Sequence, residues 1–165
     1  MNNSADILKY AMEMEKRAKE FYDFYKDKVK NYKIKQLFSG LSDMEDEHYN
    51  ILKKQLDSVE KNNTFEPLDL EISSGENIIT SKEKDLEHVD MDYDLSDLPI
   101  LRMAYAMEND FAVFYEKAVD QVDDENAKNL LRVLAKWENE HRKSFEEEVE
   151  MATKNSWFGQ SFYPF

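Results

Sequence analysis

Four glutamates in this sequence have the spacing expected of ligands for metal ions. Each lies in a stripe with steps of four, three and four residues, which places its members on one helix face, because an α-helix turns about 100° per residue. The stripes are Ala11-Glu15-Ala18-Tyr22, Leu41-Glu45-His48-Leu52, Ala104-Glu108-Phe111-Tyr115 and Leu134-Glu138-His141-Phe145. Two stripes hold a histidine one helical turn after the glutamate. We therefore expect six side chains to project into one interior: Glu15, Glu45, His48, Glu108, Glu138 and His141.

Four ionised carboxylates in one apolar interior require balancing positive charge. An unpaired buried charge is strongly destabilising, and neighbouring carboxylates repel each other. Two divalent cations balance four ionised glutamates while both imidazoles stay neutral. The chain has no cysteine, and a mixed set of carboxylate and imidazole ligands favours iron or manganese over copper(I), calcium or magnesium. We predict a pair of iron ions, with manganese or a mixed pair as the alternative.

The strength of this pattern comes from its repetition. A single Glu-x-x-His match is weak, because glutamate supplies 20 of the 165 residues. Adding 93 to a position in the first half, however, lands on a similar residue in the second half: Ile7 on Ile100, Met14 on Met107, Glu15 on Glu108, Tyr22 on Tyr115, Leu41 on Leu134, Glu45 on Glu138 and His48 on His141. Such a duplication predicts a pseudo-twofold axis with the repeated groups facing each other.

Composition points to long helices as the elements that position these groups. Three glycines and three prolines leave few turn formers for a sheet. Apolar stripes predict four helices: one from Ser4, its N-cap, to about Val29, and three that begin near Ile34, after Ser96 and Asp97, and after the turn at residues 123–124. We expect an all-α antiparallel four-helix bundle in a single domain over residues 1–165. Its two hairpins span about 4–56 and 98–154, and an acidic crossover spans 57–97.

Charge and hydropathy limit the partners and the cellular compartment that the sequence predicts. The net charge of −14 argues against nucleic-acid and membrane-surface partners. No apolar run is longer than residues 111–115, and the first residues lack the features of a signal peptide. These observations predict a cytoplasmic protein.

Several residues near the ligand positions have less certain roles. Tyr22 and Tyr115, seven residues after Glu15 and Glu108, are predicted to orient ligand carboxylates by hydrogen bonding. The residues beside the ligands, Trp137 among them, are predicted to be core packing, and His88 a solvated loop residue. The tail at 155–165, with five aromatic residues, is expected to dock on the bundle or on a partner subunit.

The two hairpins resemble the rubrerythrin-like branch of the ferritin-like superfamily. The resemblance covers residues 5–55 and 98–150 and rests on the segments MEKRAKEFY, MEDEHYNIL, MENDFAVFY and WENEHRKSF. It implies a ferritin-like fold in which Glu15 and Glu108 are terminal ligands, Glu45 and Glu138 bridge the metals, and His48 and His141 each bind one iron. It also implies reduction of hydrogen peroxide with electrons from a rubredoxin-type centre.

The chain departs from rubrerythrins in two respects. Without cysteines it has no rubredoxin-type centre, so the resemblance implies an external electron donor, either rubredoxin-like or another reductase. Phe111 stands where rubrerythrins carry an additional glutamate. The six ligands are equally similar to those of bacterioferritin, although Asp46 stands where bacterioferritin carries its haem-binding methionine.

We predict a non-haem di-iron oxidoreductase that reduces hydrogen peroxide or dioxygen under oxidative stress. The main alternative is a ferroxidase or iron-storage protein of the bacterioferritin type. A manganese catalase-like enzyme and a metal-free structural bundle are further alternatives. A homodimer or small homo-oligomer is expected. Hairpin exchange between subunits, the electron donor and the choice among peroxide, dioxygen and Fe(II) as substrate stay open.

Overall fold

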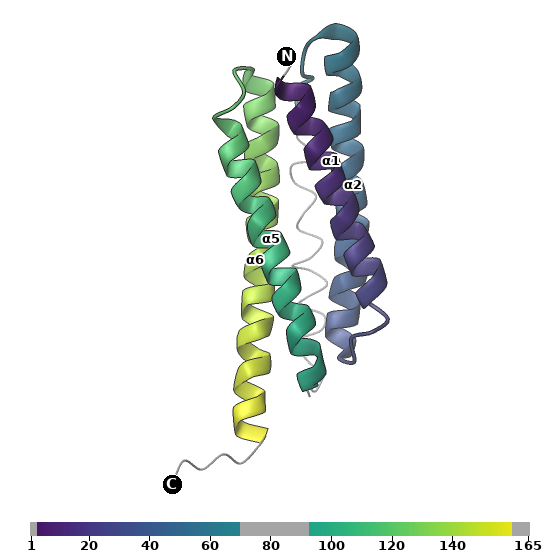
Figure 1. The fold of residues 1–165 in the computed structure, drawn as a ribbon, viewed down its shortest axis with the longest axis vertical. Helices are drawn as coiled ribbons and strands as arrows, with labels where there is room; N and C mark the ends of the chain where they lie inside the picture. Colours follow the sequence, from purple (N-terminus) through teal and green to yellow (C-terminus); the bar gives the residue numbers. More distant parts are fainter. Residues whose placement is uncertain (1–2, 70–92, 160–165) are drawn as a thin grey trace.

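The computed structural model describes residues 3–69 and 93–159, with side chains through residue 154. His88 and the side chains of the aromatic tail therefore lie outside the described residues. Helices α1 (Asn3–Tyr25) and α2 (Tyr32–Asn62) form one hairpin, and α5 (Leu98–Val119) and α6 (Glu125–Gly159) form the other. Figure 1 shows the two hairpins side by side, with α1 next to α5. The described residues contain no strand, and the predicted all-α four-helix bundle is confirmed.

The predicted helix ends required correction in the first hairpin. Ser4 lies inside the first turn of α1, so it is not the N-cap, and α1 ends at Tyr25 rather than near Val29. Val29 belongs to the connection, and its apolar side chain is nevertheless buried, which explains why it continued the stripe. The apolar periodicity therefore identified the buried face correctly but overestimated the length of the helix.

The second helix of each hairpin is longer than its apolar stripe. Helix α2 continues through Asn62, six residues beyond the predicted end at 56, and stops where Asn63 adopts a left-handed conformation with φ of 54°. Helix α6 continues to Gly159 rather than ending near Lys154. Residues 57–62 are therefore helical and not part of the crossover.

Equivalent asparagine and aspartate residues cap the second helix of each hairpin. The side chain of Asn31 accepts a hydrogen bond of 3.1 Å from the backbone N–H of Ile34. The side chain of Asp124 accepts one of 3.0 Å from Ala127. Asn31 and Asp124 are 93 positions apart, so the duplication includes the capping residue at which the second helix of each hairpin begins.

Asp97, predicted as part of the start of the third helix, joins the two hairpins. It ends a short 3-10 helix η1 (Leu95–Asp97) and stands at the N-cap position of α5, but its carboxylate makes no cap bond. It accepts hydrogen bonds from the backbone N–H groups of Lys30 and Asn31, the shortest at 2.8 Å, and is 1% exposed. The turn of the first hairpin is thereby held against the start of the second.

The core consists of two apolar clusters at opposite ends of the bundle, and the ligand stripes cross the boundary between them. Ala11 belongs to one cluster and Ala18 to the other, one helical turn on either side of Glu15. On α2, Leu41 and Leu52 lie on either side of Glu45 in the chain and likewise belong to different clusters. The six predicted ligands are therefore placed in a polar layer with apolar packing above and below.

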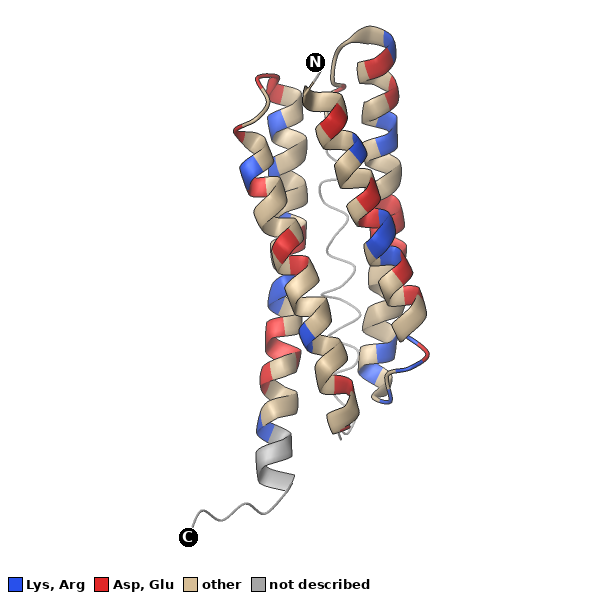
Figure 2. Cartoon of the chain, viewed as in Figure 1, with Lys and Arg blue, Asp and Glu red and all other residues tan. Residues whose placement is uncertain are grey.

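Charged residues are distributed over all four helices, as Figure 2 shows, with acidic positions in the majority. Within the described residues, no helix is both long and apolar enough to cross a membrane.

Candidate metal centre

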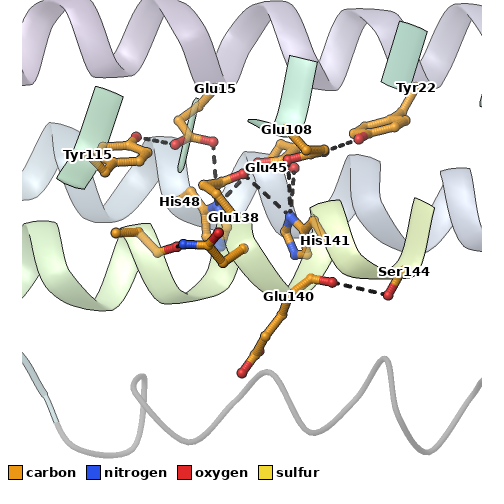
Figure 3. Close-up of polar contacts among 12 residues, drawn as sticks. Glu15, Tyr22, Glu45, His48, Glu108, Tyr115, Glu138, Glu140, His141 and Ser144 are labelled. Carbon is orange, nitrogen blue, oxygen red and sulfur yellow. Dashed lines mark hydrogen bonds and ion pairs between the residues drawn. The ribbon is translucent and has the colours of Figure 1, made fainter. Parts of the chain in front are cut away.

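All six predicted ligands meet near the middle of the bundle (Figure 3). Helix α1 contributes Glu15 and α5 contributes Glu108, while α2 and α6 each contribute a Glu-x-x-His pair. None of the six residues is more than 2% exposed. Each ligand lies close to the centre of its helix, where the backbone is fully hydrogen-bonded, so the donors are held on rigid elements.

The donors divide into two overlapping groups whose ligand atoms lie within 4.8 Å of one another. One group combines Glu15 and His48 with the shared pair Glu45 and Glu138. The other combines Glu108 and His141 with the same shared pair. The arrangement could therefore hold two metal ions, with two carboxylates between them.

The distances within the first group match a coordination shell. His48 Nδ1 lies 3.1 Å from Glu45 Oε2, 3.2 Å from Glu138 Oε1 and 3.4 Å from Glu15 Oε2. Metal–ligand bonds of about 2.0–2.2 Å separate neighbouring donors by roughly 2.8–3.1 Å in octahedral sites and by roughly 3.3–3.6 Å in tetrahedral sites. These donors are thus spaced to surround one small cation.

The second group is slightly wider. His141 Nδ1 lies 3.5 Å from Glu45 Oε1, 3.5 Å from Glu138 Oε2 and 3.6 Å from Glu108 Oε2. As in the first group, a single ring nitrogen faces one oxygen from each of three carboxylates. The two groups are therefore related by the repeat in composition and in atom arrangement.

Unsatisfied carboxylate oxygens show that the residues present fit a bound cation. Five buried oxygens accept no hydrogen bond within the described part of the chain: Glu15 Oε2, Glu45 Oε1, Glu108 Oε2, Glu138 Oε1 and Glu138 Oε2. Buried polar atoms without hydrogen bonds are rare in folded proteins and strongly destabilising. Each of these oxygens belongs to one of the two donor groups, so cations at those positions would satisfy them.

The four carboxylates do not have the same proton affinity. Burial and the negative charges of Glu138 and Glu45 raise the pKa of Glu15 and of Glu108 well above the ordinary value. Burial also acts to raise the pKa of Glu45 and Glu138, but contacts to His141 and His48 outweigh it and the net shift is downward. A cation bound between these carboxylates would favour their ionised forms and so oppose the upward pKa shift of Glu15 and Glu108.

Each predicted tyrosine donates a hydrogen bond to a ligand carboxylate of the opposite hairpin. Tyr22 on α1 donates to Glu108 Oε1, and Tyr115 on α5 donates to Glu15 Oε1 (Figure 3). A separation of seven residues is about 10 Å along one helix, too far to reach the glutamate of the same helix. Burial and the nearby glutamates raise the pKa of both phenols, which keeps them protonated as donors.

Trp137 has a contact that the sequence pattern did not reveal. Its ring stacks on the imidazole of His48, with ring centroids 4.8 Å apart and an interplanar angle of 9°. The two imidazoles are also parallel, at 5.8 Å and 9°. Trp137 is part of the apolar core, as predicted, but it also fixes the plane of one candidate ligand. The sequence showed that Trp137 is next to Glu138, but it did not show that the ring contacts His48 of another helix.

A groove on the outer face of the first hairpin reaches one ligand. Its volume is 340 Å³, and Glu45 is the one candidate ligand among its lining residues: Lys16, Lys19, Glu20, Asp23, Glu45, Asp46 and Tyr49. Lys19 pairs with Asp23 at 3.0 Å, and Asp23 accepts a hydrogen bond of 2.7 Å from Ser42. The groove rim is therefore an ordered polar network.

Comparisons with known proteins identify a family and a shared fold. The family model described as Rubrerythrin matches residues 6–149, a span that includes all six candidate ligands. A solved structure of a hypothetical protein from Pyrococcus furiosus has a TM-score of 0.68 and 22% sequence identity, with 92% of this chain and 90% of that chain covered. At that identity the likeness establishes the shared ferritin-like fold alone. The comparison with curated proteins found no match. Because the family match extends over both hairpins, the chain belongs to the rubrerythrin family.

Proposed function

We propose that this protein is a non-haem di-iron oxidoreductase that reduces hydrogen peroxide or dioxygen. The observation that carries the proposal is the convergence of four buried carboxylates and two buried imidazoles into two donor groups that share Glu45 and Glu138. Membership of the rubrerythrin family supports iron as the metal. The ligand types support it as well, because carboxylate and imidazole donors without sulfur suit iron and manganese.

In this proposal, Glu15 and His48 hold one ion, Glu108 and His141 hold the second, and the shared carboxylates lie between them. The four negative charges of the ionised glutamates then balance the four positive charges of two divalent ions. The iron pair, when bound, supplies electrons for cleavage of an O–O bond and an open position for the oxidant. Reduction of one hydrogen peroxide to two waters consumes two electrons and two protons.

The tyrosines position the outer carboxylates for this task. Tyr115 donates a hydrogen bond to Oε1 of Glu15, whose Oε2 accepts none. Tyr22 donates to Oε1 of Glu108, whose Oε2 likewise accepts none. One oxygen of each carboxylate is thus held by the protein while the other faces the donor group. Such hydrogen bonds orient ligands and tune their affinity for the metal.

The apolar clusters on both sides shelter the site from bulk water. The near-complete burial of the ligands restricts the site to small oxidants. In this proposal the electrons come from a donor outside these 165 residues, because a rubredoxin-type centre needs cysteine thiolates and these residues contain none.

Anaerobic reconstitution with Fe(II), followed by separate additions of hydrogen peroxide and dioxygen, tests the proposal. We expect two irons per chain and rapid oxidation of the iron, recorded as an increase in near-ultraviolet absorbance. Faster oxidation by peroxide supports the peroxidase reaction, and faster oxidation by dioxygen supports an oxygen-reducing one. Uptake of many irons per chain would contradict both and favour iron storage.

A matched pair of variants tests whether iron binds at the candidate site or at acidic residues elsewhere on the chain. His141→Ala should lose stoichiometric iron, because it removes a donor that the second group requires. Glu140→Ala should keep it, because Glu140 is 52% exposed and its side chain points away from the site in Figure 3. Equal iron content in both variants would reject the assignment.

A further inference from the structure

The outer surface shared by α1 and α5 carries an apolar stripe that follows the repeat. This surface, the α1/α5 face, consists of positions 10, 13, 17, 21 and 24 on α1 and the positions 93 residues later on α5. Steps of three and four residues place each set on one side of its helix. The ring of Tyr10 lies 4.9 Å from the ring of Phe114, measured between centroids, so the two sets adjoin. Six of the ten residues are apolar: Tyr10, Phe21, Phe24, Met103, Ala106 and Phe114.

Much of this apolar surface is open to solvent. Tyr10 and Phe24 are each 57% exposed and Met103 is 43% exposed, and they are three of the seven large hydrophobic residues exposed in the described part of the chain. The face also carries two acidic and two basic residues, so it is neutral although the chain has a net charge of −14. A second copy of this acidic chain therefore meets less repulsion here than over the molecule as a whole.

The charges near the centre of the α1/α5 face are opposite at equivalent positions. Tyr22 donates to Glu108 and Tyr115 donates to Glu15, so α1 and α5 run antiparallel and cross the pseudo-twofold axis near residues 18 and 111. Arg17 and Asp110 are 93 positions apart and lie within two residues of that axis. Both are exposed, with the side chain of Arg17 at 70%. The face thus presents one positive and one negative group at the same level.

We infer that two copies of this chain form a dimer through the α1/α5 face, with α1 of each copy lying on α5 of the other. A twofold axis parallel to the helices places Arg17 of each copy against Asp110 of the other. It also brings Phe24, six residues after the crossing point of α1, to nearly the level of Met103, eight residues before that of α5. A twofold axis across the helices would instead put Arg17 on Arg17, so the charges select the first arrangement.

The size of the face suits a specific dimer. The two helices have 23 and 22 residues. They are therefore roughly 33 Å long, and two packed helices are roughly 20 Å wide. Two copies would bury about 1,300 Å² in total, within the range of about 1,200–2,000 Å² that specific interfaces bury. The inference does not depend on the proposed function, because the candidate ligands project into the interior of the bundle.

Sedimentation equilibrium of the full chain tests the dimer and its charges. We expect a dimeric parent. Arg17→Asp and Asp110→Arg each create like-charge contacts and should raise the dimer dissociation constant at least about 100-fold. The double variant restores opposite charges and should dimerise like the parent, as should an equimolar mixture of the two single variants. Lys16→Asp is the matched control, because it reverses a charge on the groove side of α1, and it should leave the constant unchanged.

A second pair of variants tests the apolar part of the face. Phe24→Ser should raise the dissociation constant about tenfold, because aromatic residues in an interface carry much of its affinity. Tyr32→Ser is the control, because Tyr32 is 58% exposed but lies outside the face. This pair keeps the inference testable if a charge-reversed variant does not fold, as judged by circular dichroism.

Several outcomes would overturn the inference. A monomeric parent would do so, and its sedimentation with phosphatidylcholine vesicles would assign the face to a membrane instead. A dimer that neither charge reversal weakens would place the interface elsewhere on the molecule. Weakening by both reversals without recovery in the double variant or in the mixture would reject the contact of Arg17 with Asp110. Equal effects of Phe24→Ser and Tyr32→Ser would reject the apolar part of the face.

Discussion

The two hairpins carry the same candidate ligands and equivalent caps but differ in the polar groups around them. In the first hairpin, Lys19, Asp23 and Ser42 form a charged network at the rim of the groove. The residues 93 positions later are Ala112, Glu116 and Ala135, two of them apolar. The residue types of this network are therefore not repeated in the second hairpin.

A second pair of equivalent positions shows the same divergence. Gln55 makes two hydrogen bonds to the backbone of Glu66, the residue it meets after the end of α2. Its counterpart Glu148 is a buried carboxylate that contacts Lys33 Nζ at 2.7 Å and Tyr93 Oη at 2.5 Å. A neutral amide in the first hairpin thus corresponds to a buried carboxylate in the second that pairs with a lysine of the first.

The comparison separates what the site requires from what each hairpin can change. In the proposed site each ion would take ligands from both hairpins, so the donor groups that face each other must match in type. Residues that face outward, or toward the segments between the hairpins, meet different neighbours and are not constrained in this way. The following predictions test this division, from the largest expected effect to the smallest.

The shared carboxylates should be equivalent despite their different surroundings. Glu45→Gln and Glu138→Gln each remove a donor from both groups, so each variant should lose almost all bound metal. Glu15→Gln and Glu108→Gln affect one group each and should retain about one ion per chain. Metal analysis after reconstitution checks this. Full metal content in either shared variant would show that the two carboxylates are not shared.

The polar pair at 55 and 148 should have unequal effects on stability. Glu148→Ala leaves Lys33, whose side chain is only 14% exposed, without this partner and should lower the free energy of unfolding by about 3 kcal/mol. Gln55→Ala removes two neutral hydrogen bonds and should lower it by about 1–2 kcal/mol. Urea denaturation of the metal-free proteins measures both. A larger loss for Gln55→Ala would contradict the assignment of the ion pair as the stronger contact.

Loss of either hydrogen bond between a tyrosine and a glutamate of the opposite hairpin should weaken metal binding to the same extent. Tyr22→Phe leaves Glu108 without its donor, and Tyr115→Phe does the same to Glu15. Each variant should still bind metal but with about tenfold weaker affinity, as measured by competition with a chelator. Unchanged affinity in both variants would show that the phenols do not orient the ligands. A difference between the two variants would reveal asymmetry in the outer carboxylates.

Asp23 should give the first hairpin a small acid-dependent stability. The hydrogen bond from Ser42, with the ion pairs to Lys19 and Lys26, lowers the pKa of Asp23 from 3.8 to about 2. Because the folded-state pKa is the lower one, the contribution is complete above pH 3.8 and is lost as the pH falls toward 2.

Asp23→Asn should therefore be less stable than the parent at pH 5, by less than about 1 kcal/mol, because the pair is partly exposed. The difference should narrow as the pH approaches 2. Ser42→Ala, which introduces the residue type of the second hairpin, should weaken this pH dependence. Thermal unfolding at several pH values measures it, and a difference that grows on acidification would contradict the assignment.

Much of the fold and of the candidate site could be predicted from periodicity. The spacing of Glu15, Glu45 and their equivalents in apolar stripes predicted one buried face per helix, and the offset of 93 predicted that the faces would meet. Helix ends were less accurate. They depend on local caps such as Asn63 and on polar residues that continue a helix after its apolar face has ended.

The sequence by itself determined the four helices, the buried polar layer and the six donor types, because helical periodicity and charge are properties of local spacing. Only the tertiary structure decided that Tyr22 reaches Glu108 and that Trp137 stacks on His48. It also decided that Asp97 binds the turn of the other hairpin. Each of these contacts joins residues far apart in the chain, and its partner is selected by how two helical hairpins pack, which no spacing within one helix encodes.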